Sequence, residues 1–215
     1  MQRKTKIITA VTAALALVTL GSGTALQMHA ANDVSTVSQT VAPSSVKADS
    51  SQLTADSTSG TKQNYTVKYA DKQTADQSAT LQKKTYGSSN SAAKQVDYVG
   101  SNTEGTTVKL NKSTKAVVQG VMGHTYVHWN KGDWSVTAVA SNADATGTPT
   151  QFAKQVNKQV SSASLPKGAD TGAITVYSGT QSEEANSVTW QKGKQLYTVS
   201  GKTADTTVQL AQDAK

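Results

Sequence analysis

The chain has 215 residues, with 21 Lys and Arg against 14 Asp and Glu and a formal net charge of +7 at pH 7. It contains no cysteine, which excludes disulfides, thiolate metal ligands and thiol catalysis. Arg3 is the only arginine, and because nucleic-acid recognition relies on arginine forks, we expect no nucleic-acid partner.

A basic start and an apolar run open the chain. Three basic residues within the first six positions precede IITAVTAALALVTL at 7–20, and no charged residue occurs from Ile7 to Asn32. This pattern predicts a secretory signal peptide at 1–31, with an exported form beginning near Ala31 or Asn32. Because about 20 uncharged residues follow Lys6, an uncleaved membrane anchor is the alternative. Either way, we expect the remainder to be secreted or associated with the cell surface.

The next segment, 32–63, has the composition of a spacer. Thirteen of its 32 residues are Ser or Thr and none is aromatic, so it buries too little apolar surface to offset chain entropy. All 11 aromatic residues of the chain lie between Tyr65 and Tyr197. We therefore expect a disordered linker at 32–63 and a single folded domain at 64–215.

Short runs rich in Val, Thr and Tyr, separated by Gly, Asn and Ser, predict strands within this domain. The predicted strands are Tyr65–Tyr69, Ala79–Tyr86, Gln95–Val99, Thr106–Leu110, Ala116–Val121, Thr125–Asn130, Trp134–Ala140, Ile174–Tyr177, Ser187–Gln191 and Gln195–Val199.

Two helices are predicted. The first has Thr148 as N-cap, Pro149 at the first helical position and Gln151 where a capping box requires it, and Phe152 heads its apolar stripe. The second begins at the cap-type residue Asp205 and runs to the end of the chain.

One stretch occurs twice. Residues 129–144 read WNKGDWSVTAVASNAD, and residues 190–205 read WQKGKQLYTVSGKTAD. A turn at Lys131-Gly132 pairs Trp129 with Trp134 and places apolar residues on one face of a hairpin. The second copy follows the same rule around Gly193. A four-residue loop with Gly in the left-handed conformation is the alternative.

Each predicted hairpin leads to a helix, which gives two hairpin–helix units at about 120–163 and 174–215. We expect an α+β fold, in which the units pair into an antiparallel sheet built from β-hairpins with two helices packed on one face. Trp129 and Trp190, with Gly132 and Gly193 in the turns and Phe152 on the first helix, are expected to be structural. Trp134 has no aromatic counterpart in the second copy, so it is expected to be partly exposed and is the one Trp candidate for a ligand contact.

The order V-x-W-x-K-G, strand, helix, Leu165-Pro166, then V-x-W-x-K-G, Y-x-V-x-G and helix resembles uncharacterised extracytoplasmic domains of Gram-positive bacteria. The resemblance covers about 120–215. Such domains occur in secreted proteins, in lipoproteins and in the outer parts of membrane-bound regulators. The resemblance therefore implies an extracytoplasmic location, and the family carries no established enzymatic activity.

Catalytic and metal-binding patterns are weak. His124 and His128 lie about 13 Å apart on a strand, too far to chelate one metal, so we expect neither a metal nor a cofactor. Ser91 and Lys94 have the Ser-x-x-Lys spacing of penicillin-interacting enzymes, but no Lys-Thr-Gly follows. Glu184 with a distant Asp133 or Asp170 leaves one alternative, a small hydrolase that acts on the cell wall with paired carboxylates.

Charge suggests the partner. Residues 32–215 carry 18 Lys against 14 acidic residues. This excess predicts weak, salt-screened attraction to an anionic cell-wall polymer or another envelope component, and contact with membrane only through an uncleaved N-terminal segment. The sequence favours an exported envelope protein that binds or senses without catalysis.

Overall fold

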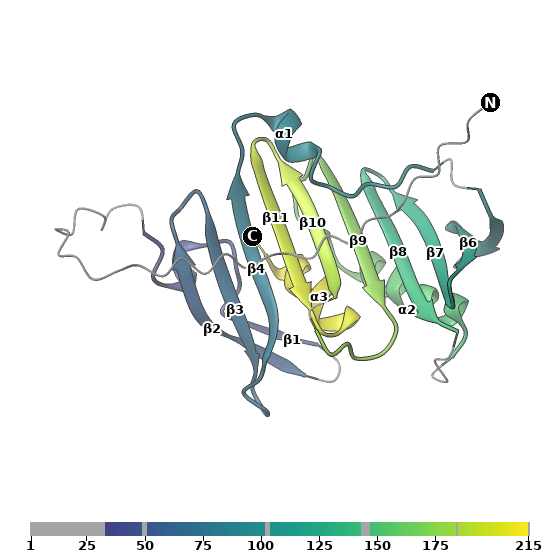
Figure 1. The fold of residues 1–215 in the computed structure, drawn as a ribbon, viewed down its shortest axis with the longest axis horizontal. Helices are drawn as coiled ribbons and strands as arrows, with labels where there is room; N and C mark the ends of the chain where they lie inside the picture. The colour runs from purple at the N-terminus through teal and green to yellow at the C-terminus, as the bar shows by residue number, and fades with distance from the viewer. Residues whose placement is uncertain (1–32, 49–50, 102–103, 143–146, 184, 215) are drawn as a thin grey trace. The chain divides into compact units, whose positions relative to one another are not determined.

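The computed structural model describes residues 33–48, 51–101, 104–142, 147–183 and 185–214, and eleven strands in these ranges form one sheet (Figure 1). Their order across the sheet is β1-β2-β3-β4-β11-β10-β9-β8-β7-β6-β5. The strands are β1 (Ser45–Lys47), β2 (Gln52–Gly60), β3 (Tyr65–Asp71), β4 (Gln77–Thr85), β5 (Thr106–Lys109), β6 (Lys115–Val121), β7 (His124–Lys131), β8 (Trp134–Ser141), β9 (Thr171–Tyr177), β10 (Asn186–Lys192) and β11 (Gln195–Gly201).

Three α-helices and one short 3-10 helix accompany the sheet in the described residues: η1 (Val37–Gln39), α1 (Ser89–Ala93), α2 (Pro149–Ser162) and α3 (Ala204–Asp213). The capping box predicted for α2 is confirmed, because the Thr148 hydroxyl accepts from the Gln151 amide and the Gln151 side chain accepts from the Thr148 amide. Helix α3 starts one residue earlier than predicted, with Thr203 as its N-cap. None of the described helices is long and apolar enough to cross a membrane.

The core lies on the face of the sheet that α2 and α3 cover. Alternate residues of β3, β4 and β7–β11 belong to one buried cluster with the apolar residues of both helices. Helix α2 packs on β7 and β8, and α3 packs on β1 and β9–β11. The largest fully buried side chains include Tyr69, Leu81, Ile174, Leu210, Val127, Val136 and Val160.

Two connections set the strand order. Strands β8 and β9 are parallel, and α2 forms the crossover between them, as parallel neighbours require. The β4–β5 connection contains α1 and reaches β5 on the far edge of the sheet. Along the way Val96 packs with Leu196 and Ala173, and the Asn130 side chain donates to the Val99 carbonyl at 2.9 Å. These residues lie on the opposite face of the sheet from the main core, so this connection covers part of that face.

The predicted α+β fold, an antiparallel sheet of hairpins with two helices on one face, is wrong. The sheet is mixed, and the described residues are 45% strand and only 18% helical. The two hairpin units do not pair edge to edge, because β9 lies between β8 and β10. The segment Gln95–Val99, predicted as a strand, forms part of the β4–β5 connection.

The predicted disordered spacer is also wrong where the structure describes it. Residues 45–47 form β1 and residues 52–60 form β2, and Val34, Val46 and Leu53 are buried in the main core. Tyrosines of β3 hold this segment: Tyr65 accepts from the Val41 amide at 3.1 Å, and Tyr69 donates to the Pro43 carbonyl at 2.7 Å. The folded unit therefore begins well before residue 64.

The two repeated hairpins share one register, which differs by two residues from the predicted one. Trp129 pairs with Val136 and Trp190 with Tyr197, so Trp129 does not pair with Trp134. The two-residue loops begin at Gly132 and Gly193, each with a φ of 57°. Glycine at the first loop position with positive φ is the arrangement of a type II′ turn, whereas a loop beginning at Lys would force a side-chain-bearing residue into that conformation. The predicted assignment of residues to the two faces of each hairpin remains correct, because a register shift of two residues preserves the alternation of side chains.

Candidate functional site

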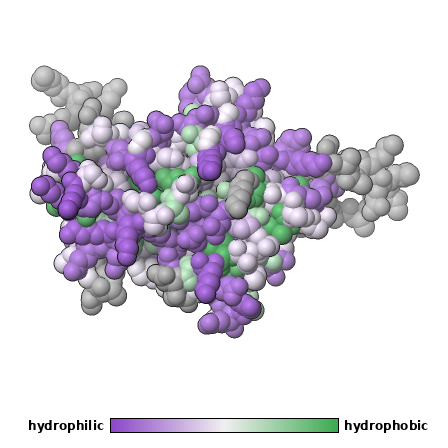
Figure 2. All heavy atoms as spheres, turned by 180° about the vertical axis from the view of Figure 1, so that it is seen from behind, coloured by the Kyte–Doolittle hydropathy of each residue, from purple (hydrophilic) through white to green (hydrophobic). Residues whose placement is uncertain are grey.

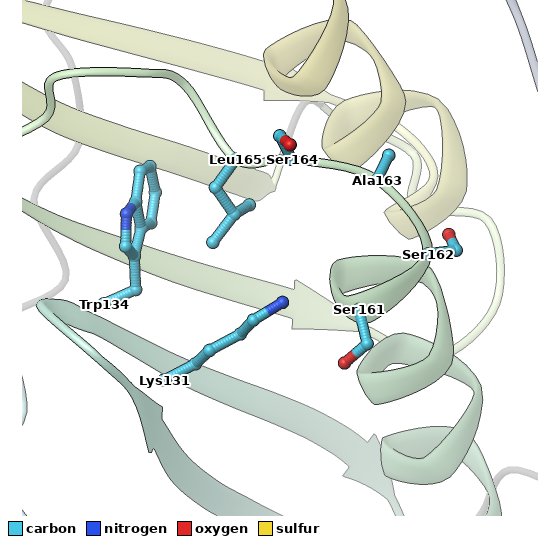
Figure 3. Close-up of a pocket in the computed structure, with 7 residues that line it drawn as sticks. All are labelled: Lys131, Trp134, Ser161, Ser162, Ala163, Ser164 and Leu165. Atoms are coloured by element: carbon cyan, nitrogen blue, oxygen red, sulfur yellow. The ribbon is translucent and has the colours of Figure 1, made fainter.

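Two open depressions flank the last turn of α2, and Ser161 and Ser162 border both. The first has a volume of about 590 Å³ and is lined by Lys131, Trp134 and 161–165. Figure 3 shows Lys131 extending toward the end of α2, with Leu165 beside Trp134. The second has a volume of about 370 Å³ and is lined by Leu110, Asn111, Lys154, Asn157, Lys158, Ser161 and Ser162.

Lys131 ties the end of β7 to α2. Its ammonium donates to the Val160 carbonyl at 2.7 Å, which satisfies a carbonyl in the last helical turn. A cation there also interacts favourably with the negative end of the helix dipole. The lysine has three donors, so the ammonium can still donate toward the depression.

The Trp134 side chain is buried rather than exposed. It is 7% exposed, against 2% for Trp129 and 4% for Trp190, so the expected partial exposure is wrong. Trp134 pairs with Gly172 of β9, and a Cβ added to Gly172 would collide with the indole ring. The ring therefore occupies space that only glycine leaves open, and it offers the first depression little more than an edge.

The second depression has a different chemistry. Asn157 is only 4% exposed, and no described residue is hydrogen-bonded to its side chain. Its polar atoms are not among the fully buried groups that lack a partner, so they open onto the depression. Across from it, the Asn111 side-chain oxygen accepts from the Ser113 and Thr114 amides at 2.9 and 2.6 Å, which leaves its NH₂ group available. Lys154 and Lys158 are exposed on the rim. This depression combines neutral donors with positive charge.

Positive charge is concentrated in the part of the chain that contributes residues to these depressions. Residues 105–169, which form β5–β8 and α2, carry seven Lys and two acidic residues. Residues 33–104 carry seven of each, and residues 170–215 carry four Lys and five acidic residues. The whole positive excess after the leader thus lies in one part of the chain. In Figure 2 the surface over this end of the sheet, at the left of the view, is mostly hydrophilic.

The other residues expected to be structural lie in or against the core. Trp129 and Trp190 belong to the main cluster, and Trp190 stacks on Tyr197 with ring centroids 5.1 Å apart and planes at 11°. Phe152 is partly buried and packs against the same cluster. The buried indole N–H of Trp129 has no acceptor among the described residues.

The histidines do not form a metal site. His128 is buried, with its ring nitrogens 3.1 Å from the Thr137 hydroxyl and 3.3 Å from the Asn130 side-chain oxygen. Burial lowers the pKa of His128 from its ordinary 6.5, because desolvation disfavours the imidazolium. His124 lies at the far end of β7, beside the Met122 carbonyl. Among the described residues no three His, Asp or Glu side chains are placed to hold a metal ion.

The residues considered for hydrolysis have local structural contacts. The Asp170 carboxylate accepts from the Gly193 amide at 2.7 Å and so stabilises the second hairpin turn. The Ser91 hydroxyl lies 2.9 Å from that of Ser88, the N-cap of α1. Glu184 lies outside the described residues.

Sequence reasoning missed Asn157 and the local concentration of charge. An Asn on a helix gives no sign of burial by itself, because the hairpin that covers it is more than 40 residues earlier in the chain. The local concentration of positive charge can be predicted from the sequence, because no acidic residue occurs in 105–132 or in 145–169. The net charge of the whole exported part does not reveal it, because the acidic residues elsewhere offset these lysines.

No protein-family model, no curated protein and no solved structure matches this chain.

Proposed function

We propose that this protein is exported and acts in the cell envelope as a non-enzymatic module that binds an anionic wall polymer. The observation that carries the proposal is the segregation of charge, a net +5 in residues 105–169 against a net charge near zero elsewhere in the exported part. A surface of one sign raises the local concentration of ligands of the opposite sign and speeds their association.

Export is supported by the basic and apolar leader, together with the resemblance to extracytoplasmic domains of Gram-positive bacteria. The polymer is proposed as the ligand because the lysines are spread over several elements at one end of the sheet. An extended anion can contact many of them at once.

The test is co-sedimentation with isolated Gram-positive cell walls. We expect the purified chain from residue 31, which forms one compact unit, to pellet with walls at low salt. Raising the salt from about 0.1 M to about 1 M shortens the Debye length from about 10 Å to about 3 Å and should release it.

Failure to pellet at low salt contradicts the proposal. Clearing of a wall suspension by the same preparation would instead support the alternative of a wall hydrolase. Retention at high salt would show that the attachment is hydrophobic or highly specific rather than electrostatic.

A further inference from the structure

We infer that the depression around Asn157 is a binding site for a phosphodiester-linked polyol chain. The inference rests on the proposed function and deepens it, since it names the residues that contact the polymer and the chemical class of their ligand.

Asn157 is the first argument. Its amide group can donate two hydrogen bonds and accept two, and no described residue is hydrogen-bonded to it. The residue is 4% exposed, but its polar atoms are not among the fully buried groups that lack a partner, so they open onto the depression. An amide that opens onto a depression without a protein partner can offer its donors and its acceptor to a ligand.

The helix presents Asn157 within a stripe of polar residues. Lys154 lies three residues before it and Ser161 four residues after it, so the three side chains share one face of α2. The β5–β6 hairpin forms the opposite wall through Leu110 and Asn111. The site therefore rests on a helix and on a hairpin whose turn is closed by the Asn111 side chain.

Uncompensated charge is the second, independent argument. Lys154 and Lys158 are one helical turn apart, a spacing at which like charges repel. At the end of the adjacent hairpin Lys109 pairs directly with Lys115, where like charges also destabilise, although these two lie toward the other face of the sheet. In the described ranges no salt bridge neutralises any of these lysines. An anionic ligand in the depression would relieve the repulsion between Lys154 and Lys158.

The lining selects the chemistry of the ligand. Lysine acts as a point charge suited to phosphate, and the exported part has no Arg whose fork would match a carboxylate in two bonds. The Ser161 and Ser162 hydroxyls and the Asn side chains both donate and accept, as polyol hydroxyls do. Leu110 is the one apolar side chain in the lining, and no aromatic ring is present on which a sugar ring could stack. A flexible hydroxylated chain with phosphate charges fits these groups.

The experiment measures the affinity of the chain from residue 31 for poly(glycerol phosphate) by calorimetry. A lysine–phosphate contact near 4 Å at a water-like dielectric is worth about a fivefold change in affinity. The double variant Lys154→Gln/Lys158→Gln should therefore bind roughly 25-fold more weakly. Asn157→Ala should bind several-fold more weakly with little loss of thermal stability, since the amide is hydrogen-bonded to no described residue.

The matched control is Lys68→Gln/Lys72→Gln, which removes two exposed lysines from the part of the chain with no net charge. It should bind as the unaltered protein does. Equal weakening by both double variants would overturn the site, because only the total charge would then matter. Unchanged binding by the Lys154/Lys158 variant would overturn it as well. Since all four lysines are exposed, both double variants should fold, and the test stands even if Asn157→Ala does not.

Polyglutamate of similar length is the second probe. Affinity equal to that for poly(glycerol phosphate) would overturn the assignment to phosphodiesters. These outcomes are separable from failure of the proposed function, which would appear as absence of binding to whole walls by the unaltered protein. Wall binding that survives the Lys154/Lys158 substitutions would leave the function in place and remove this site.

Discussion

Trp129 offers the sharpest test of the core, because its ring is buried while its N–H group lacks an acceptor among the described residues. Trp129→Ala should destabilise the protein by about 3–5 kcal/mol, the usual cost of removing a large buried aromatic side chain. This is a large share of the 5–15 kcal/mol by which a domain is typically stable.

Trp129→Phe should behave differently. Loss of the second ring costs roughly 1–2 kcal/mol in burial and packing. Removal of an unsatisfied buried donor stabilises the folded protein by about 1–3 kcal/mol. The two effects oppose each other, so we expect the Phe variant to lie within about 1 kcal/mol of the unaltered protein.

The assay is urea denaturation of the chain from residue 31, with Trp190→Phe as the matched control. Trp190 stacks on Tyr197 and its N–H is not among the unpaired buried groups, so its Phe variant should lose stability without compensation. Near-native stability of Trp129→Ala would refute the assignment of Trp129 to the core. A Trp129→Phe variant as unstable as the Ala variant would show that the indole N–H has a partner.

Three further predictions concern other parts of the protein. Gly193→Ala should cost about 1–2 kcal/mol, because φ is +57° there, and Gly193→Asn should cost less, which thermal denaturation of both variants can compare. Stability should fall as the pH drops below about 6.5, because His128 becomes protonated in the unfolded chain while burial lowers its pKa in the folded protein and keeps the ring neutral. Urea midpoints measured between about pH 7.5 and pH 5 should decline less in His128→Gln than in the unaltered protein. Lys131→Met should destabilise the protein by about 0.3–1 kcal/mol through loss of its interaction with the end of α2, and an unchanged melting temperature would show that the bond to Val160 contributes nothing.

The candidate site was predictable only in part. The lysines and the absence of neighbouring acidic residues can be read directly from 105–132 and 145–169. The role of Asn157 cannot, because its burial depends on the β5–β6 hairpin packing beside α2. For Trp134 the sequence predicted too much exposure. Its counterpart in the repeat is Gln195, which suggested an exposed position, but Gly172 on β9 leaves room for the indole ring to be buried.

The sequence by itself determined the features that depend on near neighbours. The capping residues Thr148 and Gln151 determine where α2 begins, and alternation along the hairpins determines that Trp129 and Trp190 face the core. These signals involve residues a few positions apart, whose preferences are nearly independent of the rest of the chain.

Only the tertiary structure decided the strand order and the extent of the folded unit. Placing β9 between β8 and β10 depends on how α2 packs across the sheet. In the segment before residue 64, Val34, Val46 and Leu53 are too far apart to form an apolar pattern, yet each is buried in the main core, and α3 packs on β1. Burial is a property of the assembled surface, so the free energy that orders this segment comes from contacts that no local window of sequence contains.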